Sequence, residues 1–279
     1  MAIIPQNKSI IPQNKSIIIA GDVPYEQFES LLKETAHLDI VGGYKVGVSF
    51  LDVGLRKVVD CVRQYTSKPI IYDHQKAGND IPQHIPQQFM DAMLRAGVDA
   101  VILFPFTGPV SQYEWTKAAQ ERNLGVIVGG EMTHLRFMQG DWRNETNKKD
   151  VGNKKDTENK NYTEIFLDLG MHRDLSGYIH KFASQDIYEL AARMGVQDFV
   201  LPGTKLSPFK EHKALVTRIR GCKPTFYSTG FITQGGNLSK AAQIAGEKFH
   251  PIVGRAITEA EDKRNAVEFL KRVLLDIED

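Results

Sequence analysis

The feature that most constrains the fold of this chain is a regular alternation between short apolar runs and longer amphipathic segments. It begins at Ser16 and continues almost to the C-terminus. The apolar runs are mostly continuous, which is the pattern of strands covered on both faces of a sheet. We expect strands at eight of these runs: Ile17–Ala20, Ile40–Val46, Pro69–Tyr72, Ala100–Phe104, Gly125–Val128, Phe199–Leu201, Thr225–Tyr227 and Pro251–Val253.

Helix-length amphipathic segments follow these runs. They are Tyr25–Thr35, Leu51–Gln64, Pro86–Arg95, Ser111–Arg122, Ile187–Met194, Lys210–Arg220, Leu238–Gly246 and Glu259–Leu275. Eight strands, each followed by a helix, predict an α/β fold of the (β/α)8 TIM-barrel type. An open, doubly wound sheet is the competing architecture, and so many units disfavour it. In a TIM barrel the chemistry lies at the C-terminal ends of the strands.

The charge balance excludes some classes of partner. The chain has 35 Lys and Arg against 34 Asp and Glu, a net charge of +1. It therefore offers no electrostatic basis for binding nucleic acid or an anionic membrane. No stretch approaches the roughly 20 apolar residues that a membrane helix needs, and the N-terminus lacks the apolar run of a secretion signal. We expect a cytoplasmic enzyme that acts on a small molecule.

The chain divides into an N-terminal extension and one barrel domain. The heptapeptide IIPQNKS occurs at Ile3–Ser9 and again at Ile10–Ser16. A single short duplication is too little for a repeat architecture, so residues 1–16 are interpreted as an extension. Residues 17–279 form the expected barrel. Within it, residues 141–161 are almost devoid of apolar side chains, and we expect them to form a mobile polar insertion, since they cannot bury enough surface to offset their ordering entropy.

Charged side chains gather at the ends of the first three expected strands. Asp22 follows the first strand, Lys45 ends the second, and Asp73, Lys76 and Asp80 follow the third in the run DHQKAGNDIP. In a barrel these ends converge on one pocket. Two ammonium groups and several carboxylates in so small a volume are costly to desolvate unless opposite charges alternate. The sequence therefore predicts that these charged side chains share one pocket at the barrel mouth.

A second group of residues indicates a phosphate site. Gly235 and Gly236 follow the seventh strand and precede a helix, so their backbone N–H groups could approach an anion beside the helix N-terminus. Arg255 follows the eighth strand and can bind a phosphate with two parallel hydrogen bonds. Phosphate sites on the loops after strands seven and eight recur in this fold.

The run DHQKAGNDIP resembles the signature of the orotidine 5′-phosphate decarboxylase family, Asp-x-Lys-x-x-Asp-Ile-Pro, widened by two residues. The resemblance implies that Lys45, Asp73, Lys76 and Asp80 form the family's catalytic Lys–Asp–Lys–Asp network. It also implies that Asp22 binds ribose. Because the spacing here is Asp-x-x-Lys-x-x-x-Asp, the loop must absorb two residues if these side chains are to keep their relative positions.

The resemblance extends along the barrel in the family's order. EMTH at Glu131–His134 is similar to the run after the fifth strand, so Thr133 takes the position that hydrogen-bonds the pyrimidine. GFITQGG at Gly230–Gly236 is similar to the loop after the seventh strand, whose Gln, here Gln234, contacts phosphate. VGRAI at Val253–Ile257 is similar to the end of the eighth strand, where Arg255 takes the phosphate-binding position.

The resemblance implies decarboxylation of orotidine 5′-phosphate to UMP, without a metal or another cofactor, in a homodimer. Two alternatives stay open. One is a sugar-phosphate enzyme of the same superfamily, a keto-gulonate-phosphate decarboxylase or hexulose-phosphate synthase; these relatives are metal-dependent and carry an acidic ligand where this chain has Lys45, a cation that would repel a divalent metal. The other is a non-catalytic nucleotide-binding barrel whose widened loop has lost activity.

Overall fold

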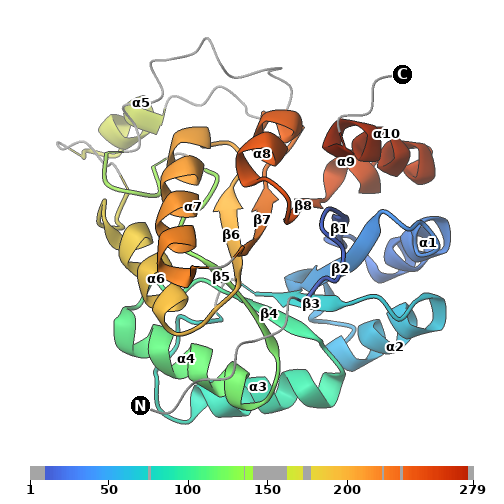
Figure 1. Ribbon diagram of the computed structural model, residues 1–279, viewed down its shortest axis with the longest axis horizontal. Helices are drawn as coiled ribbons and strands as arrows, with labels where there is room; N and C mark the ends of the chain where they lie inside the picture. The colour runs from blue at the N-terminus through green and yellow to red at the C-terminus, as the bar shows by residue number, and fades with distance from the viewer. Residues whose placement is uncertain are drawn as a thin grey trace.

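Eight parallel strands close into a barrel in chain order, from β1 to β8 (Figure 1). The structure is a computed structural model that describes residues 10–74, 77–134, 136–140, 162–171, 177–221, 223–232 and 235–275, with the side chains of 162–164 left out. The strands are β1 (Ile17–Ala20), β2 (Val41–Gly47), β3 (Ile70–Asp73), β4 (Ala100–Leu103), β5 (Gly125–Gly129), β6 (Asp198–Pro202), β7 (Thr225–Thr229) and β8 (Phe249–Val253). The predicted TIM barrel is confirmed.

Helices follow the strands, and most of them surround the barrel as an outer layer (Figure 1). They are α1 (Tyr25–Thr35), the short 3₁₀ helix η1 (Val48–Phe50), α2 (Leu55–Tyr65), α3 (Ile85–Ala96), α4 (Pro109–Glu121), α5 (Tyr162–Asp168), α6 (Ala183–Arg193), α7 (Leu206–Arg220), α8 (Leu238–Ala245), α9 (Arg255–Thr258) and α10 (Lys263–Leu275). The sequence predicted one helix over Glu259–Leu275, but the last helix begins only at Lys263. The predicted start is therefore wrong. Asp262 accepts a hydrogen bond from the backbone N–H of Asn265 and so caps a new helix at that point.

The apolar core has two layers because side chains alternate along each strand. In β4, Ala100 and Ile102 face the barrel interior, whereas Val101 and Leu103 face the surrounding helices. All four are at most 1% exposed. Burial on both faces accounts for the continuous apolar runs in the sequence.

The second copy of the heptapeptide closes the N-terminal end of the barrel. Ile11 is buried in the interior cluster, and the backbone carbonyl of Asn14 accepts a hydrogen bond from the N–H of Phe249. Gly125 makes room for Ile10, since a Cβ at Gly125 would lie 2.5 Å from the Ile10 side chain. Residues 10–16 therefore pack as part of the barrel, although the sequence placed them in an extension. Residues 1–9 lie outside the described residues.

Buried polar side chains lie just above this floor. The Tyr227 hydroxyl donates to an Asp198 carboxylate oxygen at 3.2 Å, and Ser16 Oγ lies 2.8 Å from Nδ1 of His250. The rings of Tyr227 and His250 also pack together, with centroids 5.1 Å apart. A small cluster of polar side chains thus lies just above the barrel floor, within the apolar interior.

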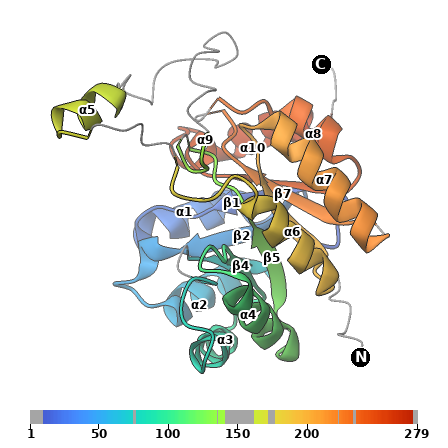
Figure 2. The same cartoon turned by 90° about the vertical axis from the view of Figure 1, so that its left-hand side faces the viewer.

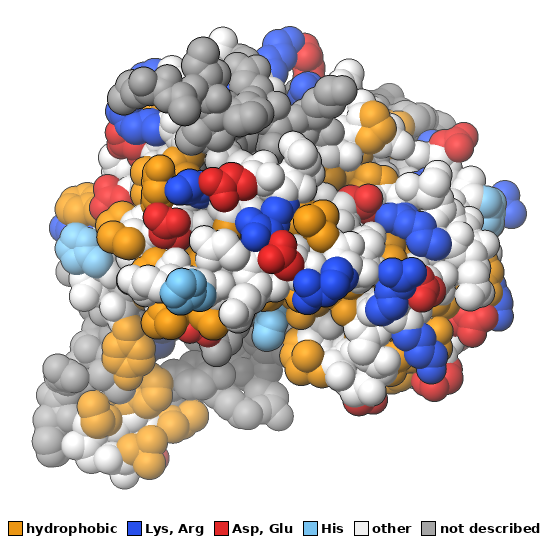
Figure 3. Space-filling model, turned by 90° about the horizontal axis from the view of Figure 1, so that it is seen from below, with side chains coloured by type: hydrophobic (Ala, Val, Ile, Leu, Met, Phe, Trp, Pro, Cys, Tyr) orange, Lys and Arg blue, Asp and Glu red, His pale blue; other side chains and the backbone are white. Residues whose placement is uncertain are grey.

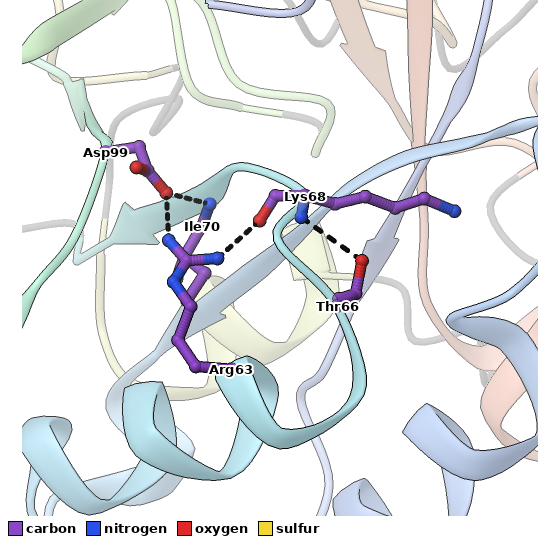
Figure 4. Close-up of polar contacts among 5 residues, drawn as sticks. All are labelled: Arg63, Thr66, Lys68, Ile70 and Asp99. Carbon is purple, nitrogen blue, oxygen red and sulfur yellow. Dashed lines mark hydrogen bonds and ion pairs between the residues drawn. The ribbon is translucent and has the colours of Figure 1, made fainter.

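A surface network ties α2 to the start of β3 at the same end of the barrel (Figure 4). Asp99 accepts hydrogen bonds from the Arg63 guanidinium and from the backbone N–H of Ile70, both at 2.7 Å. Arg63 also donates to the carbonyl of Lys68 at 2.7 Å. These contacts fix the first residue of β3 relative to α2 and to the residue that precedes β4.

A long segment separates β5 from α6 at the opposite end of the barrel. Its two flanks pair: the N–H of Gly177 donates to the carbonyl of Met138, and the N–H of Gln139 donates to the carbonyl of Ile179. A Cβ at Gly177 would lie 2.0 Å from the carbonyl oxygen of Phe137, so this close approach requires glycine. Beyond the paired flanks, α5 lies away from the barrel body (Figure 2). The insertion predicted at 141–161 lies outside the described residues.

Charged side chains of both signs lie on the face seen in Figure 3, in keeping with the net charge of +1. In the part of the chain that the structure describes, no helix is both long enough and apolar enough to cross a bilayer.

Candidate active site

Lys45 lies between two carboxylates at the C-terminal ends of the first three strands. Its ammonium nitrogen is 3.0 and 3.1 Å from the two carboxylate oxygens of Asp22, and 3.2 Å from Oδ2 of Asp73. Parallel pairing brings these residues together, since Lys45 is in register with Ala20 on β1 and with Ile71 on β3. The structure therefore unites three of the residues that the sequence placed at separate strand ends.

The electrostatics of this group favour the charged form of Lys45. The side chain of Lys45 is 9% exposed, and burial alone would lower the pKa of its ammonium group. The charges of Asp73 and Asp22, together with their hydrogen bonds, outweigh burial and hold the pKa of Lys45 above its ordinary value. The other carboxylate oxygen of Asp73, Oδ1, is buried and has no hydrogen-bond partner among the described residues.

Asp80 contacts its own loop and α4. Its side chain accepts a hydrogen bond from the backbone N–H of Ile81, and its backbone carbonyl accepts from Ser111 Oγ and Trp115 Nε1 on α4. The carboxylates that act on Lys45 are those of Asp22 and Asp73. The backbone at Asp80 is therefore attached to α4.

The widened loop between Asp73 and Asp80 is fastened to the loop after β4. The N–H of Phe104 donates to the carbonyl of Ala77, and the N–H of Phe106 donates to the side chain of Asn79 at 2.7 Å. Gly78 has φ of +91° beside Pro105, a conformation that favours glycine. Lys76, which the sequence singled out as the acid, lies outside the described residues.

The loops after β7 and β8 carry the expected phosphate ligands. The N–H of Gly235 donates to the carbonyl of Ile232, and the N–H of Gly236 donates to the carbonyl of Gly230. Both amides are therefore engaged within the loop in this conformation, and are not directed at an anion as the sequence suggested. Arg255 is exposed at the first turn of α9. Gln234 lies outside the described residues.

A second charged cluster lies at the same end of the barrel, after β5 and β6. Glu131 is buried, with one carboxylate oxygen 3.0 Å from Lys205 Nζ and the other 3.2 Å from His212 Nε2. Burial opposes ionisation of Glu131, but its contacts with His212 and Lys205 lower the pKa of the carboxyl group. Thr133 follows two residues later, and its carbonyl accepts a hydrogen bond from Thr204 Oγ1 at 3.2 Å.

Sequence reasoning missed this cluster, although Glu131 stands in the EMTH run that it used. A carboxylate directly after an expected strand was the available signal. Its partners could not be found in the same way, because Lys205 and His212 are more than 70 residues away along the chain. Among the described residues, no group of three or more His, Cys, Asp or Glu side chains is placed to hold a metal ion.

The fold and these contacts define a class of protein: a TIM barrel with a buried, carboxylate-bound lysine at the C-terminal ends of its strands. Residues 15–270 match the family described as "Orotidine 5'-phosphate decarboxylase / HUMPS family". The match covers most of the chain, so this protein belongs to that family.

Individual relatives agree with this assignment. The chain is 27% identical over 256 residues to an orotidine 5′-phosphate decarboxylase of Methanococcus maripaludis, covering 91% of this chain and 94% of the relative. It is 26% identical over 254 residues to an orotidine 5′-phosphate decarboxylase of Methanosphaera stadtmanae, covering 90% and 93%.

Solved structures share the fold. Orotidine 5′-monophosphate decarboxylase of Methanocaldococcus jannaschii, complexed with the inhibitor BMP, superposes with a TM-score of 0.66 at 21% identity, covering 93% of this chain and 98% of that one. Orotidine 5′-phosphate decarboxylase of Pyrococcus horikoshii OT3 gives a TM-score of 0.62 at 19% identity, covering 93% and 99%.

Proposed function

We propose that this protein decarboxylates orotidine 5′-phosphate to UMP, the step that completes UMP in pyrimidine biosynthesis. The observation that carries the proposal is the buried Lys45 ammonium between Asp22 and Asp73 at the barrel mouth. Family membership and two relatives that bear this name support the same reaction. Neither relative is named for a sugar-phosphate activity, so the comparisons favour the nucleotide substrate.

The reaction breaks the bond between C6 of the pyrimidine and its carboxylate. Carbon dioxide leaves, the electron pair stays on C6, and a proton must then be delivered to that carbon. Lys45 holds Asp73 at the ends of the strands, and we assign the Asp73 carboxylate to the place beside the substrate carboxylate. Lys76 is assigned as the acid that stabilises the developing charge on C6 and protonates it.

Substrate binding divides between two sides of the mouth. Asp22, half exposed beside Lys45, can accept hydrogen bonds from ribose hydroxyls, and Thr133 is assigned to the pyrimidine. Gln234 and Arg255 are assigned to the phosphate, with Gly235 and Gly236 offering room for a close approach. Because both glycine amides are engaged within their loop, binding through them requires the loop to open. Binding energy from the phosphate can offset the cost of that rearrangement and hold the reacting ring in place.

The proposed enzyme is a homodimer in which Asp80 acts in the neighbouring site. Apolar side chains are exposed after three successive strands: Leu51 after β2, Ile81 after β3 and Val110 in the first turn of α4, at 66%, 57% and 64% exposure. Large apolar side chains exposed at the same end of the barrel are consistent with a contact with another protein.

The assignment of the acid is tested with Lys76→Ala. This variant should lose turnover of orotidine 5′-phosphate while still binding UMP, because the phosphate and ribose contacts stay intact. Lys117→Ala is the matched control, since Lys117 is an exposed lysine on α4, and it should retain wild-type turnover. Near-normal turnover in Lys76→Ala would refute the assignment. Turnover of the wild type that is abolished by a chelator would instead favour a metal-dependent sugar-phosphate enzyme, and UMP binding without any turnover would favour a non-catalytic barrel.

The dimer is tested by mixing two inactive variants. If Asp80 serves the partner's site, Lys76→Ala and Asp80→Ala chains should form mixed dimers with one intact site, which restores about a quarter of wild-type activity. No recovery after mixing and refolding, with a monomer found by light scattering, would contradict the shared site.

A further inference from the structure

The Glu131 cluster joins three elements at the barrel mouth. Glu131 lies two residues beyond β5, Lys205 is the residue that precedes α7, and His212 lies in the second turn of α7. All three side chains are at most 12% exposed. His212 is held in turn by the ring of Tyr188, whose centroid is 4.7 Å from that of the imidazole. The carboxylate of Glu131 therefore connects the β5 loop to a rigid, buried support.

The same loop is held a second time, two residues further on. Thr204 Oγ1 donates to the carbonyl oxygen of Thr133 at 3.2 Å. Thr204 and Lys205 are adjacent after β6, and Glu131 and Thr133 flank Met132 after β5. Two neighbouring contacts thus fasten the two loops together on either side of Met132, and they set the position of the Thr133 backbone.

We propose that Glu131, with Lys205 and His212, is a positioning residue that directs Thr133 toward the base of the substrate. The proposal rests on the proposed function, because Thr133 is assigned to the pyrimidine there. Glu131 acts through the loop and does not itself touch the substrate. A buried ion pair often contributes little net stability, but it has few alternative arrangements and so defines geometry.

If Glu131 positions Thr133, its loss should weaken binding of the base and leave binding of the ribose and phosphate unchanged. Glu131→Gln keeps the shape of the side chain and removes its charge, so the loop loses its ion pair with Lys205. We expect kcat/KM for orotidine 5′-phosphate to fall about tenfold, and UMP to bind about tenfold more weakly, as for the loss of one positioned hydrogen bond. Ribose 5-phosphate, which has no base, should bind as tightly as to the wild type. Thr204→Val, which removes the second contact without leaving a buried charge, should show the same selectivity.

A double-mutant cycle tests whether Glu131 acts through Thr133. In a Thr133→Ala background, Glu131→Gln should weaken UMP binding by less than about a further twofold, because the Thr133 side chain that Glu131 positions is already gone. Tyr227→Phe is the control: it removes a buried hydrogen bond at the barrel floor and should leave UMP binding unchanged. Additive losses in the cycle, or equal weakening of ribose 5-phosphate, would overturn the proposal. If the wild type lacks decarboxylase activity, the proposed function fails, while the two binding measurements still decide the role of Glu131.

Discussion

Asp198→Asn should make the protein more stable at neutral pH than the wild type. Asp198 is 1% exposed at the start of β6, and burial, its largest perturbation, raises the pKa of its carboxyl group from 3.8 to about 7, although the Tyr227 hydroxyl and a backbone N–H oppose the shift. Asparagine has nearly the shape of a protonated aspartic acid and keeps an oxygen that can accept from Tyr227. The variant therefore removes the titration and retains the packing.

The magnitude follows from the two pKa values. A shift of about three units corresponds to about 4 kcal/mol at about 1.4 kcal/mol per unit. Because the pKa is raised in the folded state, Asp198 contributes most stability below pH 3.8, where both states are protonated, and that contribution is lost as pH rises toward 7. The difference in free energy of unfolding between Asp198→Asn and the wild type should grow through this range and be constant above it.

His250 acts in the opposite direction and must be separated from this effect. Burial lowers the pKa of His250 from 6.5 to about 4, so its contribution is complete above pH 6.5 and is lost as pH falls toward 4. In the wild type the two effects nearly cancel. In Asp198→Asn only the His250 effect remains. The free energy of unfolding of the variant should therefore rise by about 3 kcal/mol between pH 4 and 6.5.

Urea unfolding of both proteins at several pH values between 4 and 8 provides the measurement. Asp91→Asn is a control of opposite sign, because a hydrogen bond from Arg122 lowers the pKa of Asp91. That variant should be the less stable one, and its deficit should stay constant from pH 4 to 8, because a lowered pKa changes stability only below pH 3.8. A difference between Asp198→Asn and the wild type that does not change with pH would refute the assignment of a raised pKa to Asp198.

Three further predictions concern the floor and the mouth of the barrel. Ile11→Ala should lower the free energy of unfolding by about 2–5 kcal/mol in denaturant titrations, because Ile11 is 1% exposed within the interior cluster; an unchanged midpoint would show that the heptapeptide does not close the floor. Lys45→Met should reduce kcat by about 10²-fold or more in steady-state assays, since it leaves Asp22 and Asp73 without their shared cation; wild-type kcat would exclude Lys45 from the active site. Arg255→Ala should raise KM for orotidine 5′-phosphate while uridine, which has no phosphate, binds as before by calorimetry; equal weakening of both would place Arg255 elsewhere.

The sequence by itself determined the architecture and the end of the barrel where chemistry is expected. Apolar runs such as Ala100–Phe104 predict strands from local residue types alone. Eight strands that alternate with helices leave few topologies other than a closed barrel. Since all strands are parallel, residues directly after them must share one end. For this reason the positions of Asp22, Lys45 and Asp73 along the chain are enough to group them at the barrel mouth.

Only the tertiary structure decided which of these groups meet. Lys45 pairs with Asp22 and Asp73, whereas the backbone carbonyl of Asp80, in the same sequence motif, accepts hydrogen bonds from two side chains of α4. The contact of Glu131 with His212 joins residues 81 positions apart. No local sequence pattern predicts a contact between residues so far apart in the chain. Local sequence sets the period of an element, but the partner of a side chain depends on how distant elements pack, and packing is a property of the whole barrel.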